Sequence, residues 1–477
     1  MGDINNWPLD MHVMNLKDQE GRDNFFSLNR CAEGFSVTGG VGSGKTSGSL
    51  QFLALNFLKR DFGGIVLTAK TDEVDNWIEY CTATDRLKDL VIFGEHGTDK
   101  LCFDPMMFMA KLPGGKNAQN LSALLISLSK MGGRITGAGD GQSQDPFWDA
   151  ACRRLIGNAV NLLQLAQIDV SIENIDNIIR AAQPEVDIEV KKFLNVCLSQ
   201  AFINKSNPSD ERIFKNVKNY FQVDFKTIPE KTRGSILEIW RSIADPFLND
   251  LLAEYFMGSI SEDVSPDMTF EGKIIVVNFS VKEYFEVGAI AQQVYKIMFQ
   301  RAVERRKVDD SARPVFQFID ESHYFLTEQD YLFLTTARSK KCISVYATQQ
   351  ISNYYASLPG TKVKDKVNAF LGSLITKIIH STTDYVSNDL YAKLIGKSYQ
   401  RLQDFNASTN KPEQFWRYAY DVEPTEFGKL KTGTEDNGFK VEGMVVSRGK
   451  WANGRSFMTL QFDQHSAKKM IIALEKK

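Results

Sequence analysis

The sequence predicts a parallel α/β fold with an all-helical domain inserted into it, and three observations carry this prediction. Short apolar runs alternate with helical patterns over residues 34–111, and the same alternation returns over residues 262–435. Residues 112–261, which lie between these two parts, show helical patterns alone. The other segments are a lead-in at residues 1–33 and a β-hairpin with a tail at residues 436–477.

The first part of the α/β domain opens with a strand, a glycine-rich loop and a helix. The strand is expected at residues 35–38, and the helix at residues 47–58 because their apolar side chains recur at helical spacing. A strand at residues 65–67, a helix through Trp77 and Tyr80, and a strand at residues 90–93 follow. This alternation is typical of a parallel sheet that is covered by helices.

Helical spacing also predicts the inserted domain. Apolar residues from Phe147 to Leu163 recur at the i, i+3, i+4, i+7 positions of an amphipathic helix. Further helices are expected at residues 118–131, 172–182, 187–201 and 235–256, with breaks at residues 207–209 and 228–229. A glycine-rich loop at residues 132–141, with Arg134, is either a plain connector or a loop near DNA, a partner or the nucleotide.

The second part of the α/β domain resumes with a run of buried-type strand residues. Strands are expected at residues 273–279, 315–319, 342–347 and 373–380, with a long helix at residues 287–307. In the tail, residues 438–462 with Asn453-Gly454 as a turn predict a β-hairpin.

Composition indicates an ordinary globular chain. The 57 Lys and Arg residues nearly balance the 59 Asp and Glu residues, so DNA binding would need a local basic surface. The six cysteines are scattered and form no C-x-x-C pair, which is typical of reduced, buried thiols. No signal peptide and no apolar run long enough for a membrane span is found. We therefore expect a cytoplasmic protein without an integral membrane segment, which a partner could hold at the inner membrane.

The segment from Gly39 to Thr46 matches the phosphate-binding pattern G-x-x-x-x-G-K-[ST]. Its glycines permit backbone angles that a side chain would obstruct, and its amides then surround the phosphates. Lys45 is expected to reach the β and γ oxygens of ATP, and Thr46 to bind Mg²⁺. A chance glycine-rich turn is the alternative. The predicted nucleotide-binding residues are Gly39, Gly40, Val41, Gly42, Ser43, Gly44, Lys45, Thr46 and Ser47.

A second motif, an acidic pair, follows the predicted strand at residues 315–319. Asp320 can organise Mg²⁺, and Glu321 can orient and activate the attacking water. An adjacent pair of this kind favours ATP hydrolysis over simple nucleotide binding. The alternative is a solvated acidic pair that caps the next helix.

Taken in order, the motifs G-x-x-x-x-G-K-T, F-I-D-E, A-R-S and A-T-Q resemble the FtsK/HerA superfamily of ring-forming DNA pumps. The chain looks most similar to the conjugative coupling ATPases of type IV secretion, the TraD/TraG class. The resemblance implies a RecA-like core with an all-α domain between the two nucleotide motifs, and a homohexamer that moves DNA through a pore. It also implies that Arg338 enters the neighbouring ATP site as an arginine finger and that Gln349 senses the γ-phosphate.

Alternatives remain for these two residues and for the function. Arg338 is otherwise a surface salt bridge, and Gln349 otherwise caps a strand end. The chain departs from the coupling proteins because no transmembrane helices precede Gly34. Rival functions are a HerA-like ATPase partner of a nuclease, a secretion-assembly ATPase that acts on protein, and a docking module. Possible partners are a relaxase, a nuclease or a secretion channel.

For two further sets of residues, a structural role is favoured over a functional one. Basic groups at residues 153–154, 305–307 and 340–341 could line a pore, although solvated faces are the commoner outcome. His323 is interpreted as a packed or capping histidine, because Glu321 already suits the role of general base.

Overall fold

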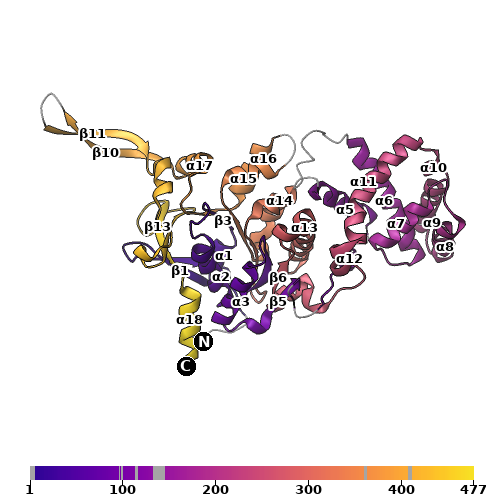
Figure 1. The fold of residues 1–477 in the computed structure, drawn as a ribbon, viewed down its shortest axis with the longest axis horizontal. Helices are drawn as coiled ribbons and strands as arrows, with labels where there is room; N and C mark the ends of the chain where they lie inside the picture. Colours follow the sequence, from indigo (N-terminus) through magenta and orange to yellow (C-terminus); the bar gives the residue numbers. More distant parts are fainter. Residues whose placement is uncertain are drawn as a thin grey trace.

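The computed structural model describes residues 6–95, 97, 100–112, 117–132, 146–358, 362–406 and 411–476. Within these residues, a twisted sheet of nine strands forms the centre of the molecule, and a helical domain extends from one side of it (Figure 1). The glycine-rich loop predicted at residues 132–141 lies outside the described residues after Gly132.

The strands of the central sheet occur in the order β13-β12-β9-β3-β8-β7-β4-β6-β5. The strands from β9 to β5 are parallel, whereas β12 and β13 extend the sheet in antiparallel pairing. Their bounds are β3 Phe35–Thr38, β4 Gly63–Leu67, β5 Leu90–Gly94, β6 Ile274–Asn278, β7 Val315–Ile319, β8 Cys342–Thr348, β9 Thr376–Ile379, β12 Lys440–Val446 and β13 Phe457–Asp463. The strands predicted in both parts of the α/β domain are therefore confirmed, although the one expected at residues 373–380 is only Thr376–Ile379 because helix α16 (Val363–Ser373) occupies the first of these residues. The C-terminal hairpin belongs to the same sheet.

Helices cover both faces of this sheet, which explains the continuous apolar runs in the sequence. Val66 of β4 packs into one hydrophobic core, while Ile65 and Leu67 pack into the other. The core of Val66 contains α2 (Gln51–Leu58) and α3 (Glu73–Ala83). The opposite core contains α13 (Val281–Arg305), α14 (Glu328–Ala337), α16 (Val363–Ser373) and α17 (Tyr385–Ile395).

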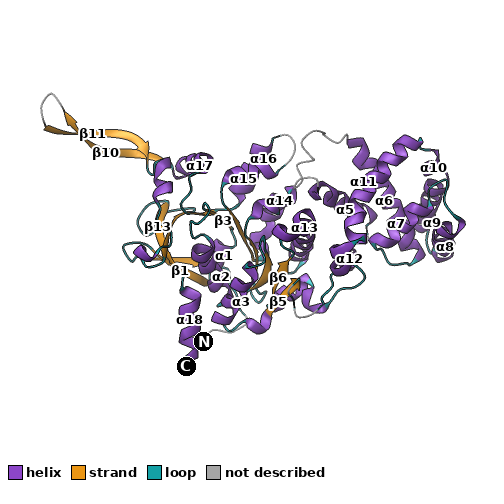
Figure 2. Ribbon diagram, viewed as in Figure 1, coloured by secondary structure: helices purple, strands orange, loops and turns teal. Residues whose placement is uncertain are grey.

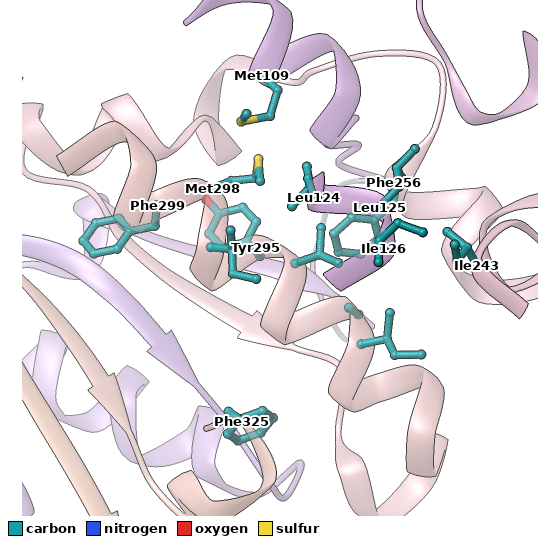
Figure 3. Packing of buried hydrophobic residues seen from close by; sticks show 14 of the residues in the cluster. Met109, Leu124, Leu125, Ile126, Ile243, Phe256, Tyr295, Met298, Phe299 and Phe325 are labelled. Carbon is teal, nitrogen blue, oxygen red and sulfur yellow. The ribbon is translucent and has the colours of Figure 1, made fainter. Parts of the chain in front are cut away.

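The inserted domain is helical throughout its described residues, as predicted (Figure 2). Helix α4, Pro105–Lys111, precedes the predicted start of this domain at residue 112. The elements of the domain are α5 Ala118–Gly132, α6 Pro146–Ala166, α7 Ile172–Ala181, α8 Ile188–Asn204, α9 Pro208–Asn219, α10 Phe225–Thr227, α11 Glu230–Leu248 and α12 Asp250–Phe256. Figure 3 shows Leu124 and Leu125 of α5 beside Tyr295 and Met298 of α13. This packing joins the inserted domain to the sheet through one continuous hydrophobic core.

Several helices differ from the sequence prediction. The helix expected over residues 47–58 begins as a π-helix, Thr46–Leu50, before α2, and the helix expected over residues 287–307 is α13, which already begins at Val281. The helix expected over residues 235–256 is two helices, α11 and α12, because Asn249 between them is extended with φ −129° and ψ 154°. The break expected at residues 207–209 is the start of α9, where the Asn207 side chain caps the helix and Pro208 is its first residue.

Four strands were not expected, and they form two hairpins. The unexpected hairpins are β1 (His12–Lys17) with β2 (Asp23–Ser27), and β10 (Lys397–Asn406) with β11 (Lys411–Tyr420). The β10–β11 hairpin projects from the body of the molecule (Figure 1). The remaining helices are α1 Leu28–Cys31, α15 Ile351–Ser357 and α18 Ser466–Glu475.

Candidate nucleotide-binding site

The predicted nucleotide motifs meet at the carboxyl edge of the sheet, meaning the edge where the parallel strands end. The last residue of β3, Thr38, pairs with Thr348 at the end of β8. In the same region, Ile319 at the end of β7 pairs with Tyr346 of β8. The residues that follow these three strands are the glycine-rich loop, Asp320-Glu321 and Gln349. Residues nearly 300 positions apart in the sequence therefore form one site.

The glycine-rich loop depends on its glycines for both shape and space. Gly42 and Gly44 have φ values of 74° and 78°, which are strained for other residues. A side chain at Gly39 would collide with Ser43 and with His380 after β9. The loop is further held by the Gly40 amide, which donates to the Ser381 carbonyl at 2.9 Å. The expected phosphate-loop conformation is thus built into these positions.

The C-terminal hairpin, β12 and β13, packs against the same loop. A Cβ atom at Gly44 would clash with the side chain of Val441 in β12. After β13, Gln464 Nε2 donates to Ser47 Oγ at 2.6 Å. His380 Nδ1 lies 2.8 Å from the Glu442 carbonyl and must donate to it, so its Nε2 accepts from Ser49 Oγ at 2.7 Å. Sequence reasoning did not find this support.

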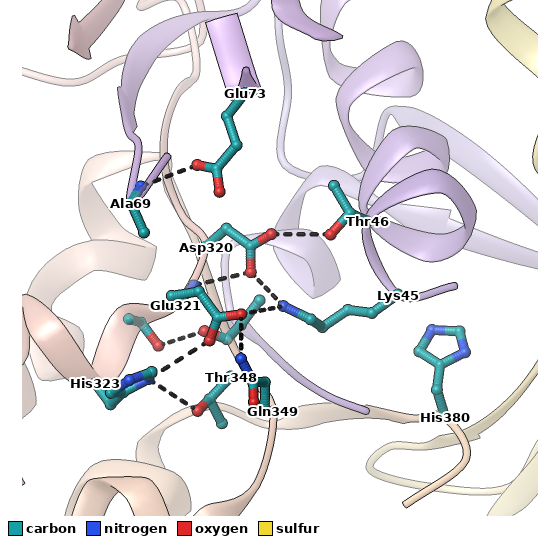
Figure 4. Close-up of polar contacts among 12 residues, drawn as sticks. Lys45, Thr46, Ala69, Glu73, Asp320, Glu321, His323, Thr348, Gln349 and His380 are labelled. Atoms are coloured by element: carbon teal, nitrogen blue, oxygen red, sulfur yellow. Dashed lines mark hydrogen bonds and ion pairs between the residues drawn. The ribbon is translucent and has the colours of Figure 1, made fainter. Parts of the chain in front are cut away.

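Buried Lys45 and Asp320 form the centre of the site together with half-buried Thr46 (Figure 4). Lys45 Nζ donates to Asp320 Oδ1, and Thr46 Oγ1 donates to Asp320 Oδ2 at 3.0 Å. Burial alone would raise the pKa of Asp320, but the Lys45 ammonium outweighs burial and holds it below its ordinary value. Burial likewise opposes the charge on Lys45, whose pKa is nevertheless raised by Asp320 and Glu321. Both groups are therefore charged at neutral pH.

Glu321 is held with one carboxylate oxygen engaged and the other without a hydrogen bond. Gln349 Nε2 donates to its Oε1 at 3.0 Å, and Lys45 Nζ lies 3.9 Å from the same atom. Its Oε2 is buried and accepts no hydrogen bond from the described residues. The Glu321 backbone lies in the left-handed region with φ 43°, a conformation that costs about 1–3 kcal/mol for such a residue. This combination holds a carboxylate oxygen ready for an incoming donor.

His323 faces the same carboxylate and is a weak base. Its Nδ1 lies 3.6 Å from Glu321 Oε2 and 3.3 Å from Thr348 Oγ1. Burial, and then the Lys45 charge, lower the pKa of His323 to about 4. The ring is therefore neutral, in agreement with its interpretation as a packed histidine.

Glu73 is a site residue that sequence reasoning missed. It lies on α3 after β4, and its Oε2 accepts from the Ala69 amide at 3.0 Å (Figure 4). Burial, followed by the charge of Asp320, raises the pKa of Glu73 well above its usual range. A cavity of about 20 Å³ lies between Glu73, Thr46 and Asp320, which is room for one water molecule. The signal was available, because Glu73 follows a parallel strand that ends at this edge.

Arg338 lies at the amino edge of the sheet, opposite the phosphate loop. It follows α14 and precedes β8, whose seven residues span about 23 Å before Gln349 is reached. Its guanidinium is 3.6 Å from Glu33 Oε1, and Arg448 Nη1 is 3.5 Å from the same oxygen. The Arg338 side chain is 55% exposed. Within one chain, Arg338 thus forms the surface ion pair and does not reach its own ATP site.

The basic groups considered for a pore are mostly engaged elsewhere. Arg306 donates to the Arg313 carbonyl at 2.9 Å, and buried Lys341 donates to the Trp7 and Asp309 carbonyls at 2.7 and 2.6 Å. Arg154 pairs with Asp224 at 2.9 Å. Arg306 and Lys341 therefore stabilise the chain itself, so neither the favoured solvated-face interpretation nor the pore interpretation holds for them.

Solved structures provide the comparison for this fold. The unbound bacterial conjugative coupling protein TrwBdeltaN70 matches with a TM-score of 0.61 and 12% identity, over 95% of this chain and 90% of that chain. TrwB in complex with ADP and Mg²⁺ matches with a TM-score of 0.58 and 12% identity, over 97% of both chains. The chain has the fold of the coupling protein TrwB. The predicted RecA-like core with its inserted helical domain, and the resemblance to a coupling-protein fold, are confirmed.

TrwB in complex with a non-hydrolysable ATP analogue also matches, with a TM-score of 0.54 and 13% identity over 91% of this chain and 87% of that chain. No protein-family model and no curated protein matches the sequence. Across the described residues, every helix is too short or too polar to cross a bilayer.

Proposed function

We propose that this protein is an ATPase that moves DNA, or a DNA–protein complex, as a ring in conjugative transfer or a related DNA-handling system. One observation carries the proposal: the buried cluster of Lys45, Asp320 and Glu321 lies at the carboxyl edge of a coupling-protein fold. The cluster supports ATP hydrolysis. The fold supports the coupling of hydrolysis to DNA movement in a homohexamer.

ATP binding is assigned to the glycine-rich loop from Gly39 to Ser47. The loop presents amides to the phosphates, and Lys45 would turn from Asp320 toward the β and γ oxygens. Thr46 and Asp320 present two oxygen atoms 3.0 Å apart, and Asp320 is ionised, so these residues fit Mg²⁺. They would hold the ion, which neutralises phosphate charge when bound. TrwB, of the same fold, is solved with ADP and Mg²⁺.

Glu321 is assigned the role of general base. Its Oε2 is buried and unpaired among the described residues, so it can accept a hydrogen bond from a water molecule. Its Oε1 is oriented by Gln349, which thereby connects the base to the end of β8. In this assignment Glu321 takes the proton of the attacking water, and Gln349 reports on the γ-phosphate through the same contact.

Arg338 is assigned to the ATP site of a neighbouring subunit. Its position at the amino edge excludes a role at its own site, and it stays 55% exposed despite the contact with Glu33. A planar guanidinium can stabilise the charge of the transferring phosphoryl group. The ring is therefore needed to complete each ATP site.

The test compares ATP turnover of the wild type with that of Glu321→Gln, without DNA and with single-stranded or duplex DNA, while the assembly mass is recorded. We expect DNA to stimulate the wild type in its assembled form, and Glu321→Gln to lose about 10²-fold or more in turnover while it still binds ATP. Glu189→Gln, at an exposed acid of α8 that pairs with Lys192, is the matched control and should behave as wild type.

Two outcomes would contradict the proposal. Turnover that is indifferent to every DNA, with stimulation by a protein substrate, would identify a protein-moving ATPase. Turnover that stays at the wild-type level in Glu321→Gln would remove the assigned base.

A further inference from the structure

The β10–β11 hairpin is a two-stranded ribbon that the nucleotide site does not use. Its strands pair over ten residues each, from Lys397 opposite Tyr420 to Asn406 opposite Lys411. The base is fixed by the Asp421 amide, which donates to the Gly396 carbonyl at 3.1 Å, and by Gln400 Nε2, which donates to the Tyr420 carbonyl at 2.6 Å. The ribbon extends away from the central sheet (Figure 1).

One face of this ribbon gathers aromatic and basic side chains. Tyr399 is opposite Tyr418, Arg401 is opposite Trp416, and Lys397 is opposite Tyr420. Because directly paired residues, and residues two positions apart, share a face of a ribbon, these six side chains form one stripe. We call this stripe the aromatic face: Lys397, Tyr399, Arg401, Trp416, Tyr418 and Tyr420.

Three large aromatic rings of the aromatic face are open to solvent. Tyr399, Trp416 and Tyr418 are 72%, 67% and 59% exposed. The opposite face of the ribbon does not pack against a hydrophobic core either. Its described side chains are polar or small and are exposed or half-buried: Ser398, Gln400, Arg417 and Ala419. The C-terminal hairpin differs, because its alternate residues are buried in the sheet. Among the described residues the Tyr399 and Tyr418 rings contact each other, and this contact leaves them and Trp416 largely exposed, so a binding partner is indicated.

We propose that the aromatic face binds single-stranded nucleic acid. Lys397 and Arg401 supply positive charge for phosphates, and no acidic residue occurs among the side chains described on this face. The rings of Tyr399 and Tyr418 lie side by side with centroids 5.2 Å apart, and Lys397 Nζ is 4.3 Å from the Tyr420 ring centre. Exposed rings beside cations are the arrangement on which successive bases stack.

The same chemistry selects single strands over duplex. In a duplex the bases stack on one another, so their faces are closed to protein rings, whereas phosphates are open in both forms. A surface that relied on Lys397 and Arg401 alone would bind both forms. The three exposed rings add an interaction that only a single strand can make. This inference rests on the proposed function for DNA as the cargo and deepens it by naming the strand type.

The test measures binding of a fluorescently labelled oligothymidine, and of a duplex of equal length, by anisotropy with the full-length protein and without nucleotide. The main variant is the triple Tyr399→Ala, Trp416→Ala and Tyr418→Ala. We expect its affinity for the single strand to fall about tenfold or more, while its weaker affinity for duplex changes little. Trp416→Phe, which keeps a stacking ring, should retain most of the binding.

Matched controls separate stacking from loss of structure and from general charge. Tyr385→Ala removes an aromatic ring of similar exposure, at the start of α17, and should bind as wild type. Arg401→Ala should weaken single-strand binding and reduce its salt dependence, whereas Arg417→Ala on the opposite face should change both less. Basal ATP turnover should stay unchanged in the triple variant.

Three results would overturn the inference: wild-type binding by the triple variant, equal losses for single strand and duplex, or a changed assembly mass in place of changed DNA binding. The last would identify a contact between copies of the chain. A failure of the proposed function would give a different result, because ATP turnover of the wild type would not be stimulated by any DNA. That result is measured in a separate ATPase assay.

Discussion

At the carboxyl edge of the sheet, Lys45 is buried between Asp320 and Glu321, whereas at the amino edge Arg338 and Arg448 share the single carboxylate of Glu33. The first arrangement places one cation between two carboxylates and leaves an excess of negative charge inside the chain. The second leaves an excess of positive charge on side chains that are 55% and 67% exposed. Both edges belong to the same strands, since β7 and β8 run from one to the other.

The difference indicates what each edge is for. A buried ion pair whose partners are all present is ready to exchange one partner for a ligand, as Lys45 would exchange Asp320 for phosphate. Two exposed arginines on one carboxylate make weak contacts that a neighbouring subunit can replace at small cost. The carboxyl edge is thus a site within the chain, and the amino edge is a surface that faces outward.

The largest expected effect is at the carboxyl edge, with Lys45→Ala. Turnover should fall to background, because the phosphates lose their cation. The variant should also lose about 3–5 kcal/mol of stability without nucleotide, since Asp320 is left buried without its partner. Lys59→Ala, at the exposed end of α2, is the control. ATPase assays and urea denaturation measure both effects, and wild-type turnover in Lys45→Ala would break the comparison.

Arg338→Ala tests the amino edge. We expect turnover of the assembled protein to fall by about 10³-fold with ATP binding unchanged, because an arginine finger acts on the transition state. Arg448→Ala, which removes the other arginine of Glu33, should stay near wild type. Mixing Arg338→Ala with Glu321→Gln should restore part of the activity, since an intact base and an intact arginine then meet between subunits. A mixture that stays inactive would argue against the assignment in trans.

Gln349→Ala should have a smaller effect. It removes the 3.0 Å hydrogen bond to Glu321 Oε1, and a bond to a charged group is worth about 1.5–3 kcal/mol, or about 10- to 100-fold in rate. We also expect DNA to stimulate this variant less than the wild type, because Gln349 connects the base to β8. Steady-state turnover with and without DNA measures both. If DNA stimulates the variant as much as the wild type, Gln349 only caps the end of its strand.

The last expected effect is a pH dependence of stability that arises from two buried histidines at the carboxyl edge. Burial lowers the pKa of His323 and of His380 to about 4, whereas an unfolded histidine titrates near 6.5. Between these values the unfolded chain binds more protons, so stability should fall as the pH decreases from about 6.5 to about 4. The slope is at most about 1.4 kcal/mol per pH unit for each histidine.

Urea denaturation at pH 7.5, 6.5 and 5.5 checks this slope. His380→Gln should flatten it. Equal slopes in the wild type and His380→Gln would show that the buried ring does not titrate as proposed.

Sequence reasoning predicts those parts whose signal is local. The strands β6 and β7 are buried along their whole length, so their apolar runs stand out from the surrounding polar sequence. The glycine-rich loop and Asp320-Glu321 are recognised by residue type and short spacing. These features needed no knowledge of how distant segments pair.

The missed parts depend on pairing or on an unusual environment. The β10–β11 ribbon begins Lys397-Ser398-Tyr399-Gln400-Arg401, which lacks the apolar alternation of a strand with one buried face. Glu73 resembles any surface acid until β4 brings it beside Asp320. The position of Arg338 at the far edge follows from the direction of β8, and the division of the helix at Asn249 leaves no trace in apolar spacing.

The neighbours of β3 also bear on how the protein folds. This strand leads directly into the phosphate loop. It pairs with β8 and β9, which lie more than 300 residues later in the chain. At a synthesis rate of about 5–20 residues per second, the strand waits about 15–60 s for its partners. Contacts so distant in sequence slow folding. The nascent chain therefore acquires its ATP site near the end of synthesis, after the helical domain has emerged and can fold.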